Sequence, residues 1–186
     1  MKRAFGLFVL LAVFLVAPLA YAQDEAPKVE LYTGFEYLHF NVNAKVANFP
    51  PSASFNGYGG GGNLEYNVNR WFGVVGDLAG YYYPAGDTGA AFSYLFGPRI
   101  NFRRGKITPF AHVLFGGFKT TDGIGGFEPE NRFAMAAGGG VDFQLSRHLA
   151  IRPAQAEYFP SKLPDGLNNR QNNFRFSSGI VIRFGS

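Results

Sequence analysis

Ionisable side chains recur at intervals of two along segments that are otherwise apolar or small, and they are the residues of this sequence that could do chemistry. In the closing segment, Arg175 and Arg183 share one phase while Phe176 and Ile182 share the other. A period of two places the two phases on opposite faces of a β-strand. The same pattern selects a candidate set made up of Glu36, Glu65, Asp77, Arg99, His112, Asp142, Arg152, Arg175 and Arg183, with Glu30 and Glu157 as further members.

Both signs of charge occur in this set, so the chemistry available to it is ion pairing. If one enclosed space holds these residues, the charges must pair, because an unpaired buried charge is costly. Two interpretations stay open. The set is either a structural plug of salt bridges or a gate in which a change of partners opens a narrow ion path.

Catalytic and metal-binding arrangements have little support. The absence of cysteine excludes thiol catalysis and Cys-ligated metal, and no two of His39, His112 and His148 have metal-ligand spacing. Ser146 lies near His148, but no orienting acid accompanies them. The stretch GYGGGG, Gly57–Gly62, matches the dinucleotide-binding glycine pattern without the helix that this motif requires. We therefore expect no enzyme, no cofactor and no metal.

Composition indicates an unusual surface. Aromatic residues make up 17% of the chain and charged residues only 16%, against about 25% charged in soluble domains. A net charge of +4 is modest, so no nucleic-acid partner is expected. The chain is long enough for one domain.

The N-terminus has the order of a secretory signal peptide. Lys2 and Arg3 precede an apolar run from Ala4 to Ala17, and a small-x-small site ends at Ala22. An N-terminal membrane anchor is the alternative, but the run is shorter than the roughly 20 residues of a spanning helix. We predict a signal peptide over 1–22 and a single domain over 23–186.

Alternating segments account for the rest of the chain, and no stretch has a convincing helical period. Eight strands are predicted at Lys28–Asn41, Asn56–Asn67, Trp71–Tyr83, Gly89–Phe102, Ile107–Lys119, Arg132–Leu145, Leu149–Phe159 and Asn173–Phe184. Short and long connections take turns between them, with both termini on the short-turn side. Outer-membrane barrels have this arrangement, and each segment is long enough for a tilted crossing.

The phase of the alternation tells which face meets which solvent. In the segment FSYLFGPRINF, Phe96 and Ile100 share one face, and Arg99 lies on the other. A soluble barrel keeps apolar residues inside, whereas here the charges accompany small residues and the opposite face is aromatic. The sequence therefore predicts an all-β, eight-stranded antiparallel up-and-down transmembrane β-barrel with its charges in the lumen.

Two further features follow from the strands. Pro98, Pro109 and Pro153 lie inside them, so bulges or frayed pairing are expected there, and a bulge near Pro153 would bring Arg152 and Glu157 onto one face. Aromatic belts are expected at both membrane interfaces. The predicted belt beside the short turns comprises Trp71, Phe72, Phe102, Phe143 and Phe184, and the belt beside the long loops comprises Tyr37, Phe40, Tyr81–Tyr83, Phe118, Tyr158 and Phe159.

These segments, with FGPRINFRRG, GGGVDFQLSRHLAIRPAQAEYF and the closing GIVIRFG, resemble small outer-membrane β-barrels, the relatives of the outer-membrane protein A barrel and the opacity-type porin-like proteins. The resemblance covers Lys28 to Phe184. It implies an outer membrane of the Gram-negative type, outer-membrane lipid as surroundings, and the barrel assembly machinery as a partner during biogenesis. The last strand is similar to the family's assembly signal, although Gly185 and Ser186 follow Phe184.

The expected function is a structural and surface role by a monomer, with slight ion permeability through a lumen filled by charge. A narrow porin, a surface adhesin and a lipid-modifying membrane enzyme are the alternatives. The adhesin would bind an unknown extracellular ligand through the loops Val42–Phe55 and Thr120–Asn131. Its candidate contact residues are Phe49, Phe55, Ile124 and Phe127. Cations on the short-turn side could meet lipid phosphates or periplasmic partners; these are Arg70, Arg103, Arg104, Lys106 and Arg147.

Overall fold

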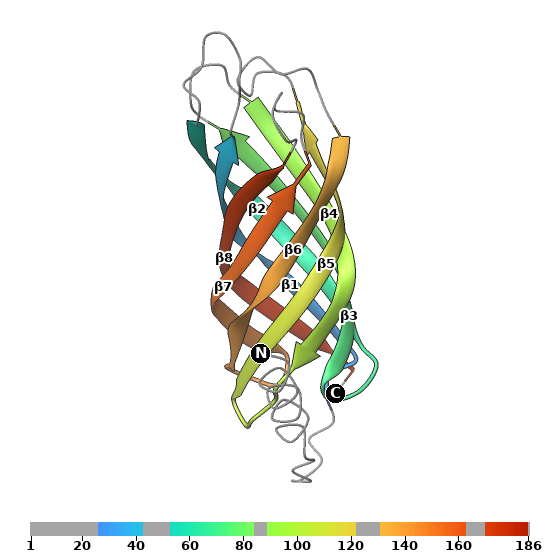
Figure 1. Ribbon diagram of the computed structural model, residues 1–186. Coiled ribbons are helices and arrows are strands. Elements are labelled where there is room, and N and C mark those ends of the chain that lie inside the picture. The colour runs from blue at the N-terminus through green and yellow to red at the C-terminus, as the bar shows by residue number, and fades with distance from the viewer. Residues whose placement is uncertain (1–25, 43–52, 84–88, 122–130, 163–169, 186) are drawn as a thin grey trace, which may run out of the picture.

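The computed structural model describes residues 26–42, 53–83, 89–121, 131–162 and 170–185 (Figure 1). Within these ranges, eight strands pair antiparallel with their neighbours along the chain, and the last pairs with the first to close a barrel. The strands are β1 (Val29–Val42), β2 (Ala53–Asn67), β3 (Phe72–Tyr83), β4 (Gly89–Asn101), β5 (Ile107–Thr120), β6 (Asn131–Gln144), β7 (Leu149–Ser161) and β8 (Gln171–Phe184). The predicted fold class is confirmed.

The described residues contain no helix with the length and apolar character needed to cross a membrane.

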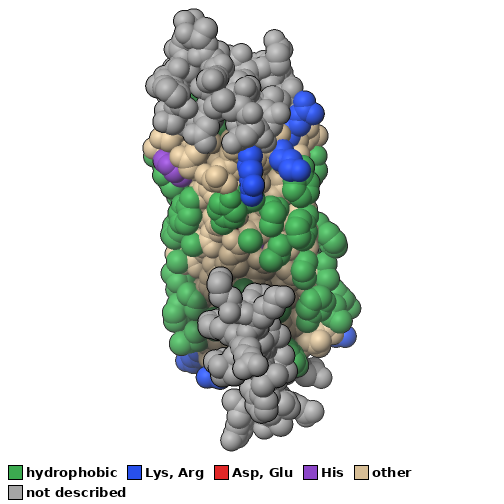
Figure 2. All heavy atoms as spheres, in the orientation of Figure 1, with side chains coloured by type: hydrophobic (Ala, Val, Ile, Leu, Met, Phe, Trp, Pro, Cys, Tyr) green, Lys and Arg blue, Asp and Glu red, His purple; other side chains and the backbone are tan. Residues whose placement is uncertain are grey.

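The alternation of the sequence appears directly in the barrel wall. Along β4 every second side chain is buried and the others are exposed. Phe96 is 64% exposed, whereas Arg99, three positions on, is 1% exposed. Figure 2 shows the result on one face of the barrel as a broad band of hydrophobic side chains, with Lys and Arg above and below it. The polar phase therefore lies in the lumen and the apolar phase forms the outer surface.

Strand β7 contains the predicted irregularity. Its register with β8 shifts between Arg152 and Gln155, and the facing register of β6 with β7 shifts between Val141 and Phe143. As a result Arg152, Gln155 and Glu157 are all buried in the lumen. The bulge expected near Pro153 is confirmed.

The other two prolines do not form bulges. Pro98 faces Val74 in an unbroken register, and the β4–β5 pairing skips Pro98 without changing its phase. Pro109 faces Val141, also without a shift. On its other side Pro109 accepts a hydrogen bond from Phe102, just past the end of β4. The backbone N–H that Pro109 lacks therefore falls at the end of the β4–β5 ladder. Its absence removes no hydrogen bond from within that ladder.

The predicted aromatic belts are correct on one side only. The aromatic residues beside the short turns are exposed, as are Tyr82 and Tyr158 beside the loops. Tyr37 is half-buried, and the remaining loop-side rings point inward and are buried: Phe40, Tyr81, Tyr83, Phe118 and Phe159. The physical reason is phase, because each of these rings lies an even number of residues from a lumen residue of its own strand, as Phe40 does from Glu36.

Candidate functional site: the lumen

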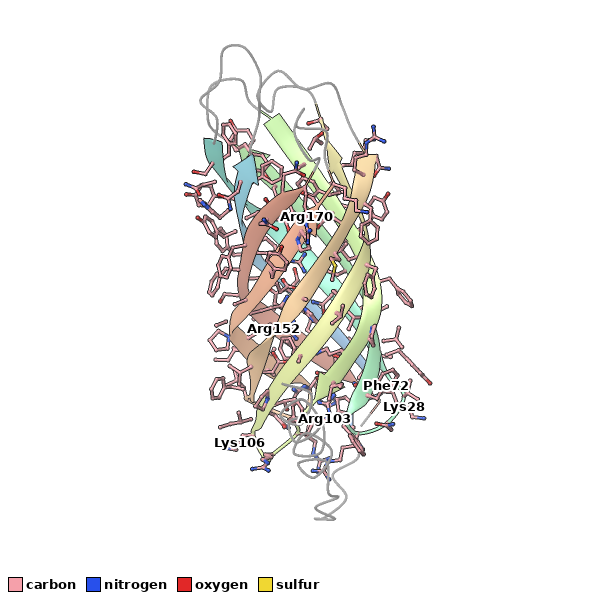
Figure 3. All side chains as sticks on the ribbon, viewed as in Figure 1. Lys28, Phe72, Arg103, Lys106, Arg152 and Arg170 are labelled. Carbon is pink, nitrogen blue, oxygen red and sulfur yellow. The ribbon has the colours of Figure 1, made fainter. Side chains whose placement is uncertain are left out.

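The structure places all nine candidate residues inside the barrel. Their side chains are buried together with those of Glu30 and Glu157. They come from all eight strands, with two of them on β8, so closure of the barrel is what brings them together. Figure 3 shows the side chains along the ribbon, with Arg103 near the short turns, Arg152 farther up and Arg170 toward the loop ends.

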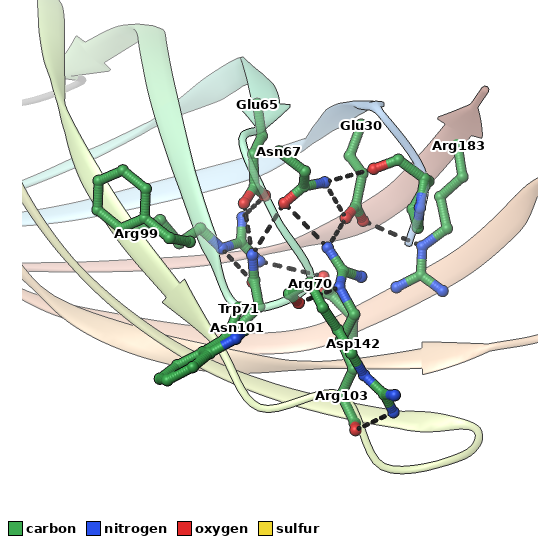
Figure 4. Close-up of polar contacts among 12 residues, drawn as sticks. Glu30, Glu65, Asn67, Arg70, Trp71, Arg99, Asn101, Arg103, Asp142 and Arg183 are labelled. Carbon is green, nitrogen blue, oxygen red and sulfur yellow. Dashed lines mark hydrogen bonds and ion pairs between the residues drawn. The ribbon is translucent and has the colours of Figure 1, made fainter. Parts of the chain in front are cut away.

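The lowest cluster closes the short-turn end (Figure 4). Arg103 forms an ion pair with Glu30, and Arg183 Nε donates to the other oxygen of Glu30 at 3.0 Å. Asn67 Nδ2 donates to Glu30 Oε1 at 3.0 Å. Two cations and an amide thus hold one carboxylate at the mouth of the lumen.

The next cluster crosses the lumen. Arg99 lies 3.1 Å from Glu65 and 3.2 Å from Asp142. Arg152 donates to both oxygens of Asp142, at 2.7 and 3.0 Å. Such two-point contacts fix the geometry of guanidinium and carboxylate. The cluster therefore connects opposite parts of the barrel wall through well-defined ion pairs.

One aromatic ring lies within this cluster. The guanidinium carbons of Arg99 and Arg152 lie 3.4 and 4.4 Å from the centroid of the Phe110 ring. A ring face attracts a cation electrostatically, and more strongly where water is excluded. Phe110 thereby supplies partial negative charge to two arginines that share a single aspartate.

The middle of the lumen is organised by Arg175. Its Nη1 donates to Asp77 at 2.7 Å, and its Nε and Nη2 donate to Glu157 at 2.5 and 2.8 Å. His112 Nε2 lies 2.6 Å from Glu157 Oε1. The histidine is therefore a hydrogen-bonding member of the network.

Glu36 differs from the other lumen carboxylates. It is buried, yet among the described residues no ion pair reaches it and its Oε2 has no hydrogen-bond partner. The described lumen contains the carboxylates Glu30, Glu36, Glu65, Asp77, Asp142 and Glu157, and the arginines Arg99, Arg103, Arg152, Arg175 and Arg183. Glu36 is the carboxylate left over when these groups are paired.

A second, apolar layer fills the loop side of the lumen. The ring of Phe118 lies at its centre, with centroids 5.9 Å from Phe40, 6.3 Å from Tyr81 and 5.5 Å from Phe159. Leu38, Leu95 and Leu114 belong to the same buried cluster. Arg175 joins the two layers, since its guanidinium carbon lies 5.5 Å from the ring centroid of Phe159.

Sequence reasoning missed three parts of this site. Arg103 is expected from the sequence among the turn cations that meet lipid phosphates or periplasmic partners, but its long side chain reaches back to Glu30. Phe110 was passed over because an apolar residue in a polar phase carries no obvious signal. The apolar layer could have been found from phase alone, since Phe118 is six positions from His112 on the same strand.

The glycine-rich stretch has a packing role in β2. A Cβ on Gly59 would lie 1.8 Å from the carbonyl oxygen of Gly80, and one on Gly61 would lie 2.9 Å from Glu36 Cγ. Absence of side chains here lets the wall of β2 and β3 close and leaves room for Glu36. The stretch continues as a strand to Asn67, so the helix of a dinucleotide motif does not follow.

The candidate loop contacts fall mostly outside the described residues, as Phe49, Ile124 and Phe127 do. Phe55 is described, and its assignment to a loop was wrong. It lies in β2, faces Phe40 in the register with β1 and packs against the apolar layer. The reason is that β2 begins at Ala53 and Phe55 continues its inward phase.

The histidines are not assembled into a catalytic arrangement in the described part of the chain. His39 lies 2.8 Å from Asn56, His112 is in the lumen with Glu157, and His148 is exposed in a short turn. The described residues also contain no group of three His, Cys, Asp or Glu side chains placed to hold a metal ion.

A family model described as the outer membrane protein β-barrel domain matches residues 7–180. The chain belongs to this outer-membrane β-barrel family. Membership implies a location in the outer membrane of a Gram-negative bacterium. Comparison with curated proteins found no match.

Solved structures with the same fold are remote in sequence from this outer-membrane barrel. Neisserial surface protein A is 12% identical with a TM-score of 0.63, covering 83% of this chain and 97% of that one. Ail, the attachment invasion locus protein of Yersinia pestis, is 19% identical with a TM-score of 0.51, covering 84% and 99%. OprG from Pseudomonas aeruginosa is 12% identical with a TM-score of 0.57, covering 87% and 98%. At these identities the likeness establishes the shared fold.

Proposed function

We propose that this outer-membrane barrel has a structural and surface role, as a wall element whose lumen is closed to ions at rest. The observation that carries the proposal is the presence of two different barriers in series. The ion-paired layer from Glu30 to Arg175 occupies the lumen from the short turns to the middle, and the apolar layer around Phe118 follows on the loop side.

The two barriers act on an ion in different ways. In the charged layer the guanidiniums already have carboxylate and ring partners, so a passing ion would have to displace one of them. In the apolar layer an ion would lose its hydration without compensation. Rearrangement of one salt bridge would leave the second barrier in place, which favours the plug over the gate.

The proposed role is not catalytic, and a monomer in lipid suffices for it. Support for the monomer comes from the closed ladder, in which β8 pairs with β1 from Val29 opposite Phe184 to His39 opposite Phe174. A closed barrel offers no strand edge for pairing with a second copy. We further propose that β8, which ends its alternation at Phe184, is read by the barrel assembly machinery.

Conductance in planar bilayers tests this function. The folded wild-type protein is expected to give no discrete conductance steps, and Arg175→Ala alone is expected to behave in the same way. A triple change of Arg175, Phe118 and Phe159 to alanine, which breaches both layers, should produce steps. Discrete openings of the wild-type protein that Arg175→Ala alters would instead assign it to the narrow porins.

Ligand binding at the cell surface is a second candidate function. The structural relative Ail has been solved in complex with the heparin analogue sucrose octasulfate, at 20% identity and a TM-score of 0.51. Exposed cations at the loop ends of β5 to β8, such as Lys119 and Lys162, favour an anionic ligand for the present protein as well. Retention of the protein on a heparin column at physiological salt would support this role, and passage through it would not.

A further inference from the structure

One arginine at the short-turn mouth of the lumen has a donor group that the barrel does not use. Arg183 is 3% exposed, and its Nε donates to Glu30 Oε2 at 3.0 Å. Its Nη2 is buried and has no hydrogen-bond partner among the described residues. Figure 4 shows the same arrangement, with a single dashed line from Arg183 to Glu30. A buried donor without a partner is costly, and arginine cannot lose its proton to avoid that cost.

The ion pairs at this mouth contain one positive charge in excess. The cluster above it is balanced, because two carboxylates and two guanidiniums pair with one another: Glu65 and Asp142 with Arg99 and Arg152. At the mouth, however, Glu30 pairs with both Arg103 and Arg183. Within the described lumen, no second carboxylate pairs with either of these two arginines. One carboxylate therefore serves two cations.

We propose that Arg183 and Arg103 bind one small oxyanion, a phosphate or carboxylate group, at the short-turn mouth of the lumen. Because the Nε of Arg183 is committed to Glu30, its two amino groups remain as a fork of donors. Such a fork fits two oxygens of one phosphate or carboxylate group. Arg103, which is 10% exposed, contributes the second charge from the other oxygen of Glu30. The bound oxyanion gives Nη2 its missing acceptor and balances the charge of the mouth.

The position of the site favours a soluble anion over a lipid head group. Glu30 and Arg183 face each other in the register of β1 with β8, and both are buried on the inward phase. The next residue along β8, Phe184, has the outward phase and is exposed on the lipid-facing surface. The wall of the barrel therefore stands between the site and the surrounding lipid. The anion enters along the axis of the barrel, from the periplasm.

The site is compatible with a lumen that is closed to ions. It lies at the end of the charged layer, outside the contacts of Arg99 with Glu65 and Asp142. An anion held by Arg183 has no route onward, because the guanidiniums above it already have carboxylate partners. We therefore infer a binding site at the mouth and not the first step of a conduction path.

Equilibrium dialysis against radiolabelled inorganic phosphate tests the proposal. The folded protein, in a nonionic detergent at fixed ionic strength, is expected to take up one equivalent of phosphate at saturation. Arg183→Gln should weaken binding roughly tenfold, the contribution of a hydrogen bond to a charged group. Glu30→Gln should have the opposite effect and tighten binding roughly tenfold, because it removes the carboxylate that competes for both arginines. A defect in folding cannot produce tighter binding.

Three controls accompany these variants. The exposed turn cations are changed in R104Q/K106Q/R147Q, which should bind phosphate as wild type does. Acidic residues precede the barrel at Asp24 and Glu25, so D24N/E25Q tests whether the chain supplies its own anion; its affinity should equal that of wild type. Heat-dependent gel mobility shows which variants are folded. If Arg183→Gln does not fold, Arg183→Lys, which keeps the charge but not the fork, should also bind more weakly.

A lipid arm separates the two sources of phosphate. Phosphatidylglycerol added to the detergent micelles should not displace the labelled phosphate from the wild-type protein, and displacement would assign the site to a lipid head group instead. The proposal is also overturned if wild type takes up no phosphate, if only D24N/E25Q does, or if Arg183→Gln and Glu30→Gln bind as wild type does. Loss of binding in R104Q/K106Q/R147Q would place the anion on the outer surface.

Discussion

Arg99 is held from three directions, with its guanidinium carbon 3.4 Å from the centroid of the Phe110 ring and its amino groups 3.1 Å from Glu65 and 3.2 Å from Asp142. Desolvation of an arginine is expensive, and no single one of these partners would offset it. Together they surround the cation so completely that its side chain is 1% exposed. A barrel this narrow can therefore bury charge near its axis and remain closed.

The ring in this arrangement should have a measurable share in stability. Phe110→Leu keeps much of the apolar volume but removes the ring face from Arg99 and Arg152. We expect the free energy of unfolding to fall by about 1–2 kcal/mol, the size of a desolvated cation–π contact. Urea titration of the protein folded into lipid vesicles measures it. The control is Phe115→Leu on the outer face, and an equal loss there would mean that the ring acts only through its volume.

Neutralising an ion-paired lumen carboxylate and neutralising the one without an ion pair should change the stability of the barrel in opposite directions. Glu157→Gln removes the carboxylate that accepts from two nitrogens of Arg175 and leaves Asp77 as its one described ion-pair partner, so it is expected to destabilise the barrel by about 3–5 kcal/mol. Glu36→Gln removes the carboxylate that has no ion pair, so stability should stay the same or rise by about 1 kcal/mol. The same urea titration compares the two isosteric variants. A loss of similar size at Glu36 would show that its charge has a partner in the folded protein.

The contacts of the glycines predict where a methyl group is tolerated. Gly59→Ala would drive a Cβ to 1.8 Å from the carbonyl oxygen of Gly80, whereas a Cβ on Gly80 itself would meet nothing within 4 Å. Gly59→Ala should therefore lower the fraction of protein that reaches the heat-modifiable folded form, and Gly80→Ala should not. Band intensities of unboiled samples give both fractions. Normal folding of Gly59→Ala would mean that β2 and β3 separate at little cost.

The outward phase gives a fourth prediction. Phe96→Arg places a cation on the acyl-facing surface and should cost about 2–4 kcal/mol if the residue lies near the bilayer midplane. Phe102→Arg, beside a short turn, should cost about 1 kcal/mol or less at an interface. Urea titrations of both variants in vesicles give the difference. Equal costs would argue against a depth-dependent environment around the barrel.

Much of this architecture could be predicted because a strand in a membrane barrel has only two faces. Once Arg99 and Phe96 are assigned to opposite faces, the phase of every other residue in β4 follows, and the bulge in β7 is the shift that lets Arg152 and Glu157 share a lumen. Phase also predicts the inward direction of Phe118. The belt assignment failed there because it relied on residue type, which says that aromatic rings favour interfaces, and ignored position in the alternation.

Other parts of the lumen could not be predicted from the pattern. The reach of Arg103 to Glu30 depends on how the short turns fold over the barrel mouth. Which carboxylate is left without a partner depends on the stagger between strands, since Glu36 and Asp77 have the same phase and the same chemistry. Only the closed register decides that Arg175 meets Asp77 and leaves Glu36 aside.

The pairing of β1 with β8 that closes the barrel has a consequence for the cooperativity of folding. It joins the two ends of the chain by eleven consecutive pairings, from Val29 opposite Phe184 to His39 opposite Phe174. Loss of β8 would strip the backbone partners from both β1 and β7, and each orphaned amide in hydrocarbon costs several kcal/mol. No seven-stranded remnant can persist in the bilayer at that cost. A chain that lacks β8 is therefore not a weakened barrel but a protein with no stable structure in the membrane. Cellular quality control need only detect whether the barrel has closed.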